Sequence, residues 1–359
     1  MLHKFIFSFI FLASSLHANI VPNIILDTWY GKYTIDEPVL CELIKSKAVQ
    51  RLKHINQYGV LDYIIAPQYF NRYDHSIRVM VTLRRFGASL LEQIAGLLHD
   101  VSHTVFSHVG DHVFKQVSNK DSYQDGIHIW YLNRTDIPEI LNTHGITIAD
   151  IDHKDNGFTM LEQDLPDICA DRLSYTIDGG LIEHKLTYYD IRTMLDHVHF
   201  QDGVWFFDDV TIARKFADVS MHLHLNLFNT VWNFVIYDWT AQVLLRAVEI
   251  DLIILDDIHF SVDDVVWDIL NKSSDKEIQK LLYKAYNYND FFALGSPDDQ
   301  DKYLKGKCRC IDPLVKTKDG LKRLAELDQE FDLRLKDVQK LTSDGWYIKY
   351  TQSKKRTNE

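Results

Sequence analysis

Residues 99–108, HDVSHTVFSH, decide how this chain folds and what chemistry it can carry. They follow a segment, 90–98, whose apolar residues recur at helical spacing, so a core-facing helix delivers the adjacent pair His99 and Asp100 to one buried point. An isolated buried charge is too costly, so an imidazole beside a carboxylate there must be paired or bound to a cation. The alternative interpretation is a helix C-terminal pair in which His99 interacts with the negative end of the helix dipole.

Two further segments carry residues of the same kind. Residues 71–76, NRYDHS, open an amphipathic stretch and place His75 in the first turn of a helix. Downstream, Pro166 stands where a first helical turn tolerates proline, and Asp171 and Tyr175 lie one turn apart on a single face. Along the chain, the metal-binding residue types therefore occur in the order His, His-Asp, Asp.

This order, with its flanking residues, resembles the HD-domain metal phosphohydrolases, and within them the branch of deoxynucleoside triphosphate triphosphohydrolases. The resemblance covers residues 30–180, and beyond them only a helical pattern continues. The segments that carry it are 37–38, 50–59, 71–76, 99–108 and 171–175.

The two imidazoles and two carboxylates of this pattern form a mixed nitrogen and oxygen donor set. Such a set suits one divalent transition metal, iron, manganese or similar, and suits a thiolate-preferring metal poorly. An octahedral ion held by four side chains keeps two positions for water and a phosphoryl oxygen, so we expect a catalytic site. A metal that lowers the pKa of water from ~15.7 toward ~7 serves the hydrolysis of a phosphate ester. The predicted ligands are His75, His99, Asp100 and Asp171.

The resemblance also implies roles for residues around the metal. In the family, the positions matching His103 and His108 contact phosphates and assist proton transfer, and further positions face the nucleotide. The predicted catalytic residues are His103, His108, Asp111 and His128. The predicted substrate-binding residues are Gln57, Arg72, Arg172 and Tyr175.

Two segments depart from the family pattern. Residues 122–125, Ser-Tyr-Gln-Asp, stand where the family usually carries a His-Glu pair, so the expected general acid is missing there. His128, one turn later, is the candidate substitute, and a solvated or packing role is the alternative. Asp178 and Gly179 stand where the triphosphohydrolases have an Arg-Asp pair. Hydrolysis of a phosphate ester is therefore a firmer prediction than hydrolysis of a triphosphate.

Composition and charge narrow the partners. The chain has 359 residues, of which 46% are hydrophobic, so it can bury a substantial core. The formal net charge of −12 argues against strong binding to nucleic acid, which calls for a basic excess. We expect a small phosphorylated substrate, a nucleotide, and a possible homo-oligomer.

The N-terminal residues 1–18 have the pattern of a secretory signal peptide. Lys4 precedes an apolar run over 5–13, and small and polar residues follow. The run is too short for a membrane span and no second one is long enough, so we expect a secreted or periplasmic protein that is not an integral membrane protein. The alternative is a cytoplasmic protein that buries this segment.

The expected fold is mostly all-α. It comprises an HD-domain helical bundle over 30–180, a helical accessory region over 181–345, and a polar tail over 346–359, with at most a small β-hairpin at 198–207 turning at Asp202-Gly203. The helices are expected at 36–47, 48–57, 74–86, 88–99, 104–117, 122–132, 135–143, 158–177, 186–196, 211–232, 235–250, 262–271, 275–286 and 319–342.

Three alternatives remain open. The first is a different enzyme class on the same scaffold, either a nucleotide phosphomonoesterase or a cyclic-nucleotide phosphodiesterase. The chain could instead hold a structural metal in an exported binding module, or its histidines could be satisfied core residues of another all-α fold. Separately, the thiols of Cys308 and Cys310 could oxidise to a disulfide. Residues two apart close a strained ring, so pairing with another chain or with a distant cysteine is equally open. A lone Cys-x-Cys is weak evidence for a metal site.

Overall fold

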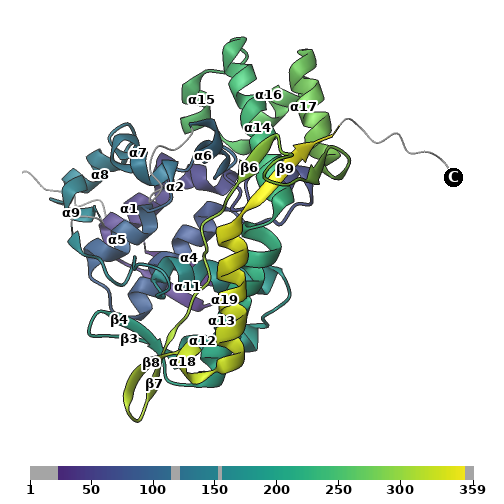
Figure 1. Cartoon of the computed structure of the whole chain (residues 1–359). Coiled ribbons are helices and arrows are strands. Elements are labelled where there is room, and N and C mark those ends of the chain that lie inside the picture. Colours follow the sequence, from purple (N-terminus) through teal and green to yellow (C-terminus); the bar gives the residue numbers. More distant parts are fainter. Residues whose placement is uncertain (1–22, 115–121, 153–155, 352–359) are drawn as a thin grey trace, which may run out of the picture.

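Helices make up most of the part of the chain that this computed structural model describes, residues 23–114, 122–152 and 156–351 (Figure 1). The α-helices are α1 (Pro38–Lys45), α2 (Lys47–Arg51), α3 (Leu61–Ile64), α4 (Arg72–Arg85), α5 (Leu90–Leu98), α6 (Val109–Val113), α7 (Tyr123–Leu132), α8 (Ile137–Thr143), α9 (Ile148–Ile151), α11 (Ala170–Ile182), α12 (Tyr188–His197), α13 (Val210–Leu223), α14 (Val231–Glu249), α15 (Leu255–Phe260), α16 (Asp263–Lys272), α17 (Lys276–Tyr286), α18 (Leu324–Leu327) and α19 (Gln329–Asp344). Short 3₁₀ segments occupy η1 (Leu52–His54) and η3 (Tyr288–Asp290), and a π-helical segment, η2 (His224–Phe228), continues α13.

Helices α4, α5 and α11 pack together and form the frame of the N-terminal half. Side chains cap the first two, because Asn71 Oδ1 accepts from the Asp74 amide at 2.8 Å and Ser89 Oγ accepts from the Glu92 amide at 3.2 Å. Gly96 lets α5 approach α4 closely, since a Cβ there would lie 2.3 Å from a methyl carbon of Leu83. The ends of these helices therefore meet in one buried place.

The loop after α5 is not helical where a helix was predicted to start at 104. Phe106 and Ser107 adopt φ values of 57° and 54°, and α6 begins only at Val109. The Phe106 amide donates to Asp263 Oδ1 at 2.7 Å, so a side chain from α16 holds the loop. This distant contact, which local sequence does not reveal, replaces the first helical turns; residues 115–117 of that prediction lie outside the described ranges.

The segment before α11 is also irregular where a helix over 158–177 was predicted. The Met160 and Leu161 amides donate to the carboxylate of Glu92 at 2.9 and 3.0 Å. These two bonds fix the segment against α5, and α11 starts at Ala170. Its first turn then carries Asp171.

Strands are more extensive than the expected single hairpin, which corrects the fold class to mainly helical with three small sheets in the described ranges. The strands are β1 (Ile24–Thr28), β2 (Gly31–Ile35), β3 (Val198–Gln201), β4 (Val204–Phe207), β5 (Phe292–Leu294), β6 (Lys302–Leu304), β7 (Leu314–Thr317), β8 (Gly320–Arg323) and β9 (Trp346–Tyr350). The β3–β4 hairpin forms as predicted, and β7 adds to β4 in parallel with β8 beyond it. The third sheet has the order β5-β9-β6.

Two C-terminal predictions differ from the structure because strands stand where a helix and a polar tail were expected. The helix expected over 319–342 starts as strand β8, and α19 begins at Gln329. The expected polar tail over 346–359 begins with β9, the central strand of its sheet, and Ile348 in that strand is fully buried. β8 forms a hairpin with the adjacent β7, whereas β9 pairs with β5 and β6, which lie 42 or more residues earlier in the sequence.

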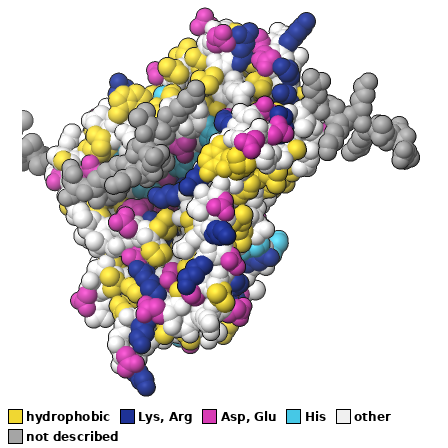
Figure 2. All heavy atoms as spheres, in the orientation of Figure 1, with side chains coloured by type: hydrophobic (Ala, Val, Ile, Leu, Met, Phe, Trp, Pro, Cys, Tyr) yellow, Lys and Arg dark blue, Asp and Glu magenta, His cyan; other side chains and the backbone are white. Residues whose placement is uncertain are grey.

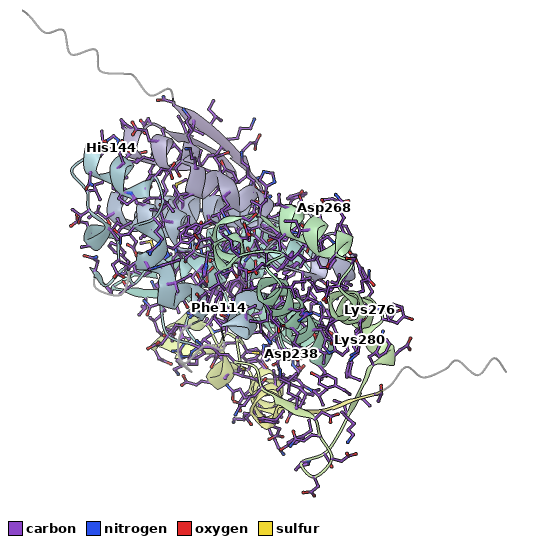
Figure 3. The ribbon with its side chains drawn as sticks, turned by 90° about the horizontal axis from the view of Figure 1, so that it is seen from above. Phe114, His144, Asp238, Asp268, Lys276 and Lys280 are labelled. Carbon is purple, nitrogen blue, oxygen red and sulfur yellow. The ribbon has the colours of Figure 1, made fainter. Side chains whose placement is uncertain are left out.

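The C-terminal elements flank the helical frame. In Figure 1, α14 to α17 gather at one end and α19 runs beside α13. The connection from β6 to β7 runs along the molecule, from the sheet β5-β9-β6 to the sheet β3-β4-β7-β8. Seen from above, Phe114 and Asp238 lie toward the middle, whereas His144 lies at the opposite end from Asp268, Lys276 and Lys280 (Figure 3). None of the helices in the described ranges combines the length and apolarity needed to cross a membrane. The predicted signal segment 1–18 lies outside those ranges.

Candidate metal centre

Four predicted ligands converge at the meeting point of α4, α5 and α11. His75 Nε2 lies 2.9 Å from Asp171 Oδ1 and 3.8 Å from Asp100 Oδ2. His99 Nε2 lies 3.5 Å from Asp100 Oδ1 and 3.6 Å from Asp171 Oδ1. Ligand atoms of His75, His99 and Asp171 all lie within 4.8 Å of one another. The structure therefore brings together four side chains that are spread over about a hundred residues of sequence.

His99 supplies the observation that tests whether this set fits a cation. Its Nδ1 lies 2.7 Å from the Gly96 carbonyl, so this nitrogen donates, and Nε2 is the nitrogen that would offer its lone pair to a cation in place of a proton. Nε2 is buried without a hydrogen-bond partner between the carboxylates of Asp100 and Asp171. A backbone carbonyl that fixes the far nitrogen is typical of metal-binding histidines, and the donor set fits a divalent cation.

The charges at the centre favour ionised carboxylates. Burial opposes ionisation of Asp100, but Arg72, His99 and His103 hold the pKa of this carboxyl well below its usual range. Burial also opposes a charge on His99, yet the carboxylates of Asp100 and Asp171 raise its pKa to about 10. Without a cation, the imidazoles thus carry protons that neutralise the carboxylates, and metal binding displaces such protons.

Asp178 supports His75 from behind, a role that the sequence analysis missed. It is fully buried, and it accepts hydrogen bonds from Arg78 Nε at 2.8 Å, Trp29 Nε1 at 2.9 Å and the Tyr30 hydroxyl at 3.2 Å. Its Oδ2 lies 3.9 Å from His75 Nδ1. The available signal was its position two turns after the ligand Asp171, on the same face of α11.

Arg72 holds Asp100. Its guanidinium donates to Asp100 Oδ2 at 2.5 Å, to Ser107 Oγ at 2.8 Å and to the Gln57 carbonyl at 3.5 Å. Arg72 thus joins a metal ligand to the loop after α5 and to the segment before α3. The predicted contacts of Arg72 and of the Gln57 side chain with substrate stay predictions.

The predicted catalytic histidines form a row that leads away from Asp100. His103 Nε2 lies 3.2 Å from Asp100 Oδ1, and its ring centre lies 5.0 Å from that of His108. His108 Nδ1 lies 3.1 Å from Asp111 Oδ2. Burial and the charge of Arg72 lower the pKa of His103 to about 3, so its ring is neutral at neutral pH. The side chains of His108 and Asp111 are 34% and 30% exposed, so the outer end of the row reaches solvent.

The segment that departs from the family pattern caps a helix here. The Ser122 amide and hydroxyl both donate to Asp125 Oδ2, at 3.0 and 2.7 Å, at the start of α7. The neighbouring Tyr123 amide donates to Asp111 Oδ1 at 2.7 Å. His128 Nδ1 lies 3.0 Å from Ser102 Oγ, which ties α7 to the loop after α5. The catalytic role of His128 stays a prediction.

Arg172 and Tyr175 lie on α11 after the ligand Asp171. Arg172 donates to the Asp167 carbonyl at 3.1 Å, and its other terminal nitrogen lies 3.7 Å from a carboxylate oxygen of Glu162. Burial, with the nearby Asp171, raises the pKa of Glu162 to about 7. Tyr175 packs edge-on against Phe228 with ring centres 5.9 Å apart.

Arg309 is a further residue of this region that the site prediction missed. Burial raises the pKa of the Tyr175 hydroxyl, and the charges of Arg172 and Arg309 oppose this rise. No ion pair involves Arg309 among the residues that the structure describes. Its distance along the chain from Tyr175 left no local signal.

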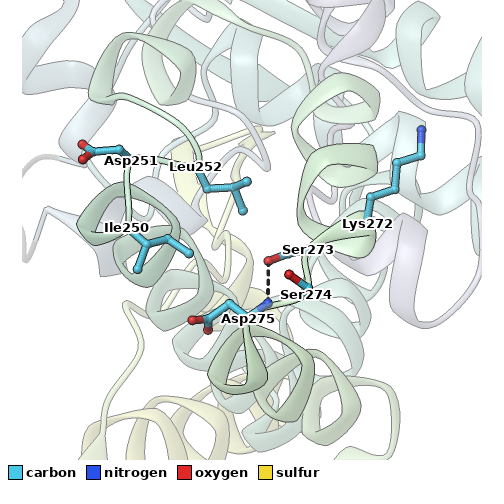
Figure 4. Close-up of a pocket in the computed structure, with 7 residues that line it drawn as sticks. All are labelled: Ile250, Asp251, Leu252, Lys272, Ser273, Ser274 and Asp275. Carbon is cyan, nitrogen blue, oxygen red and sulfur yellow. Dashed lines mark hydrogen bonds between the residues drawn. The ribbon is translucent and has the colours of Figure 1, made fainter.

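One face of the molecule is hollowed. Histidine and basic side chains are visible in the hollow that crosses the face shown in Figure 2. A separate open pocket of about 510 Å³ lies at the end of α14, lined by 250–252 and 272–275, where the Asp275 amide donates to Ser273 Oγ (Figure 4). It contains none of the residues of the metal centre.

Comparisons with known proteins agree with this geometry. The sequence model of the HD domain matches residues 72–167. The chain is 35% identical over 291 residues to the uncharacterised protein YdhJ of Bacillus subtilis, covering 81% of this chain and 88% of that protein. It is 32% identical over 313 residues to the metal-dependent phosphohydrolase cns2 of Cordyceps militaris, covering 81% of this chain and 84% of that protein.

A solved structure also shares the fold. A phosphohydrolase from Bacteroides thetaiotaomicron superposes with a TM-score of 0.70 at 16% identity, covering 92% of this chain and 100% of that chain. Together with the convergence of two histidines and two aspartates, these relationships assign the family. The chain belongs to the HD-domain family of metal-dependent phosphohydrolases.

Proposed function

We propose that this phosphohydrolase cleaves a phosphate ester of a nucleotide at the centre formed by His75, His99, Asp100 and Asp171. The observation that carries the proposal is the buried, unpaired Nε2 of His99 between two carboxylates. A bound divalent cation supplies Lewis acidity, which lowers the pKa of water and offsets charge on a phosphoryl group. The four side chains hold it, with iron or manganese the best match to the donor set.

The row from His103 to Asp111 manages protons in this proposal. His103 donates through Nε2 to Asp100, since a carboxylate only accepts, and its buried Nδ1 has no hydrogen-bond partner. His108 is oriented by Asp111 at 3.1 Å and is partly exposed, so it can exchange a proton with solvent. We assign His108 as the general acid for the leaving oxygen.

A nucleotide is supported by the groups beyond the metal ligands. Tyr175 and Phe228 offer aromatic surface for a base or sugar. Arg309, whose charge acts on Tyr175, offers a cation to a phosphate oxygen. Asp178 and Gly179 stand where the triphosphohydrolases have an Arg-Asp pair, so this position offers no arginine to a triphosphate. A monophosphate ester therefore fits better than a triphosphate.

Substrate profiling with a metal-exchanged enzyme tests this function. Metal-stripped protein, reloaded with Mn²⁺ or Fe²⁺, is assayed for phosphate release and for product identity on nucleoside mono-, di- and triphosphates and on cyclic nucleotides. We expect metal-dependent hydrolysis of one nucleotide class, and its loss in Asp100→Asn. His197→Gln, which alters an exposed histidine paired with Asp208, is the matched control. A folded, metal-loaded enzyme that is inert on every nucleotide contradicts the proposal.

We also propose that the protein is exported. The support is the charged and apolar pattern of residues 1–18, with Lys4 ahead of the run over 5–13. N-terminal sequencing of the protein from its native host tests this, and the expected result is a mature chain that begins within a few residues of position 18. Recovery of the intact N-terminus from the cytoplasmic fraction contradicts it.

A further inference from the structure

A second cluster of ligand-type side chains lies outside the catalytic centre. The sulfur atoms of Cys308 and Cys310 and a ring nitrogen of His224 all lie within 4.8 Å of one another. His224 begins the π-helical segment η2 at the end of α13, whereas the two cysteines belong to the connection from β6 to β7. His224 is fully buried and Cys310 is 5% exposed. Residues 84 and more positions apart in sequence are thus brought to one buried point.

The hydrogen bonds of His224 determine which of its nitrogens is available. The Thr342 hydroxyl donates its single proton to the Val338 carbonyl at 2.8 Å. His224 Nε2 lies 2.9 Å from the same hydroxyl oxygen, so Nε2 must be the donor there. His224 Nδ1 therefore carries a lone pair, and it is buried without a hydrogen-bond partner.

This arrangement is typical of a metal-binding imidazole. Metal-binding histidines usually donate their other ring nitrogen to a fixed acceptor, which orients the ring and sets the tautomer. A buried acceptor left unpaired is destabilising, and a cation would remove that penalty. The local widening of α13 into a π-helix at His224 adds to the case, since such segments are frequent at functional sites.

We propose that Cys308, Cys310 and His224 bind a thiophilic metal ion of the Zn²⁺ class. Two sulfurs and one nitrogen are the ligand types that Zn²⁺ selects, whereas the catalytic centre offers only nitrogen and oxygen. All four cysteines are free in the structure. A metal ion would engage His224 together with both sulfurs, whereas a Cys308–Cys310 disulfide would leave His224 out, so metal binding explains more of the geometry than oxidation does.

The ion would fasten the β6–β7 connection to two helices. His224 extends from α13 and its hydrogen-bond partner Thr342 lies on α19, so the site joins three segments of the C-terminal half. Arg309 stands between the two cysteine ligands, and its charge acts on both His224 and Tyr175. The second metal would therefore fix the backbone on both sides of Arg309.

Elemental analysis of tag-free, full-length protein purified without added metal tests this site. We expect one thiophilic ion per chain in addition to the catalytic metal. Cys308→Ser/Cys310→Ser should lose that ion and keep the catalytic one, whereas Asp171→Ala should do the reverse. Cys41→Ser, which removes another buried free thiol, is the matched control and should keep both ions.

Cobalt substitution gives a readout that does not depend on activity or on the double variant. Co²⁺ added to metal-free protein should give a thiolate charge-transfer band, which His224→Gln weakens and Cys308→Ser/Cys310→Ser abolishes. Absence of the band in folded, reduced wild-type protein overturns the proposal. A wild-type chain isolated with a Cys308–Cys310 disulfide and no thiophilic metal, from either an oxidising or a reducing preparation, overturns it too.

Discussion

Replacing Asp178 with asparagine should weaken metal binding without touching a ligand. Asp178 is fully buried, with its Oδ2 3.9 Å from His75 Nδ1 and 2.8 Å from Arg78 Nε. The substitution keeps the shape but removes the charge that faces the far side of the His75 ring. Loss of such a supporting group lowers metal affinity by about 10–100-fold. This corresponds to about 1.4–2.8 kcal/mol of binding free energy.

The same substitution also reduces stability, and the two effects must be separated. Removing one partner of a buried ion pair is destabilising by about 3–5 kcal/mol, because Arg78 would keep its charge without Asp178. A domain with a free energy of unfolding of about 5–15 kcal/mol remains folded at low temperature after such a loss. Metal affinity is therefore measured in the cold, and circular dichroism checks that the variant is folded.

The assay is isothermal titration calorimetry, in which Mn²⁺ is added to metal-free protein and the heat of binding gives the affinity. Trp29→Phe is the matched control, since it removes one hydrogen bond to Asp178 and keeps an aromatic ring beneath Arg78, whose guanidinium lies 4.2 Å from the indole. We expect the control to bind Mn²⁺ as the wild type does. Unchanged affinity in folded Asp178→Asn would refute the argument that Asp178 orients His75.

Four further predictions concern other residues of the centre. Arg72→Met removes the guanidinium from a buried ion pair with Asp100 and should lower the free energy of unfolding by about 3–5 kcal/mol, and an unchanged denaturant midpoint would contradict this. The pKa of His99 rises from 6.5 to about 10 on folding, so protonated His99 stabilises metal-free protein fully below pH 6.5, and this stabilisation is lost as the pH rises toward 10. A melting temperature of EDTA-treated protein that increases between pH 6.5 and 10 would contradict this prediction. His108→Gln should lower kcat about 10²–10⁴-fold with metal content unchanged, whereas full activity removes His108 as the acid. Arg309→Ala should raise KM and leave kcat near its original value, with Lys305→Ala, in the same connection, as control; equal KM values exclude a phosphate contact.

The convergence of the four predicted ligands could be expected from sequence because each stands near a helix end that has a local signal. The apolar spacing over 90–98 predicted α5 almost to its last residue, and His99 and Asp100 follow directly. His75 was correctly placed near the start of α4 and Asp171 in the first turn of α11. A short pattern, a cap and a change in hydropathy are enough to locate such residues.

The rest of the centre depends on contacts that only the folded chain makes. The loop after α5 is held by Asp263, which lies 157 residues beyond Phe106. Strand β7 joins β4 across more than a hundred residues, and the charge of Arg309 acts on Tyr175 from the same distant segment. Local propensity could not predict these pairings, because tertiary contacts override it.

The candidate metal-binding side chains could be located from sequence, whereas the charged residues that contact and neutralise them could not, and the contacts of each group explain the difference. The tautomer of His99 is set within a single helical turn, since the Gly96 carbonyl left free at the end of α5 accepts from its Nδ1. The charges that keep the carboxylates ionised come from elsewhere, because Arg72 pairs with Asp100 across 28 residues and Asp178 takes its donors from the turn between β1 and β2 and from α4. A buried metal centre needs both kinds of contact. The ligands follow from helix-end geometry, whereas the residues that make their burial tolerable can lie anywhere that the fold brings close.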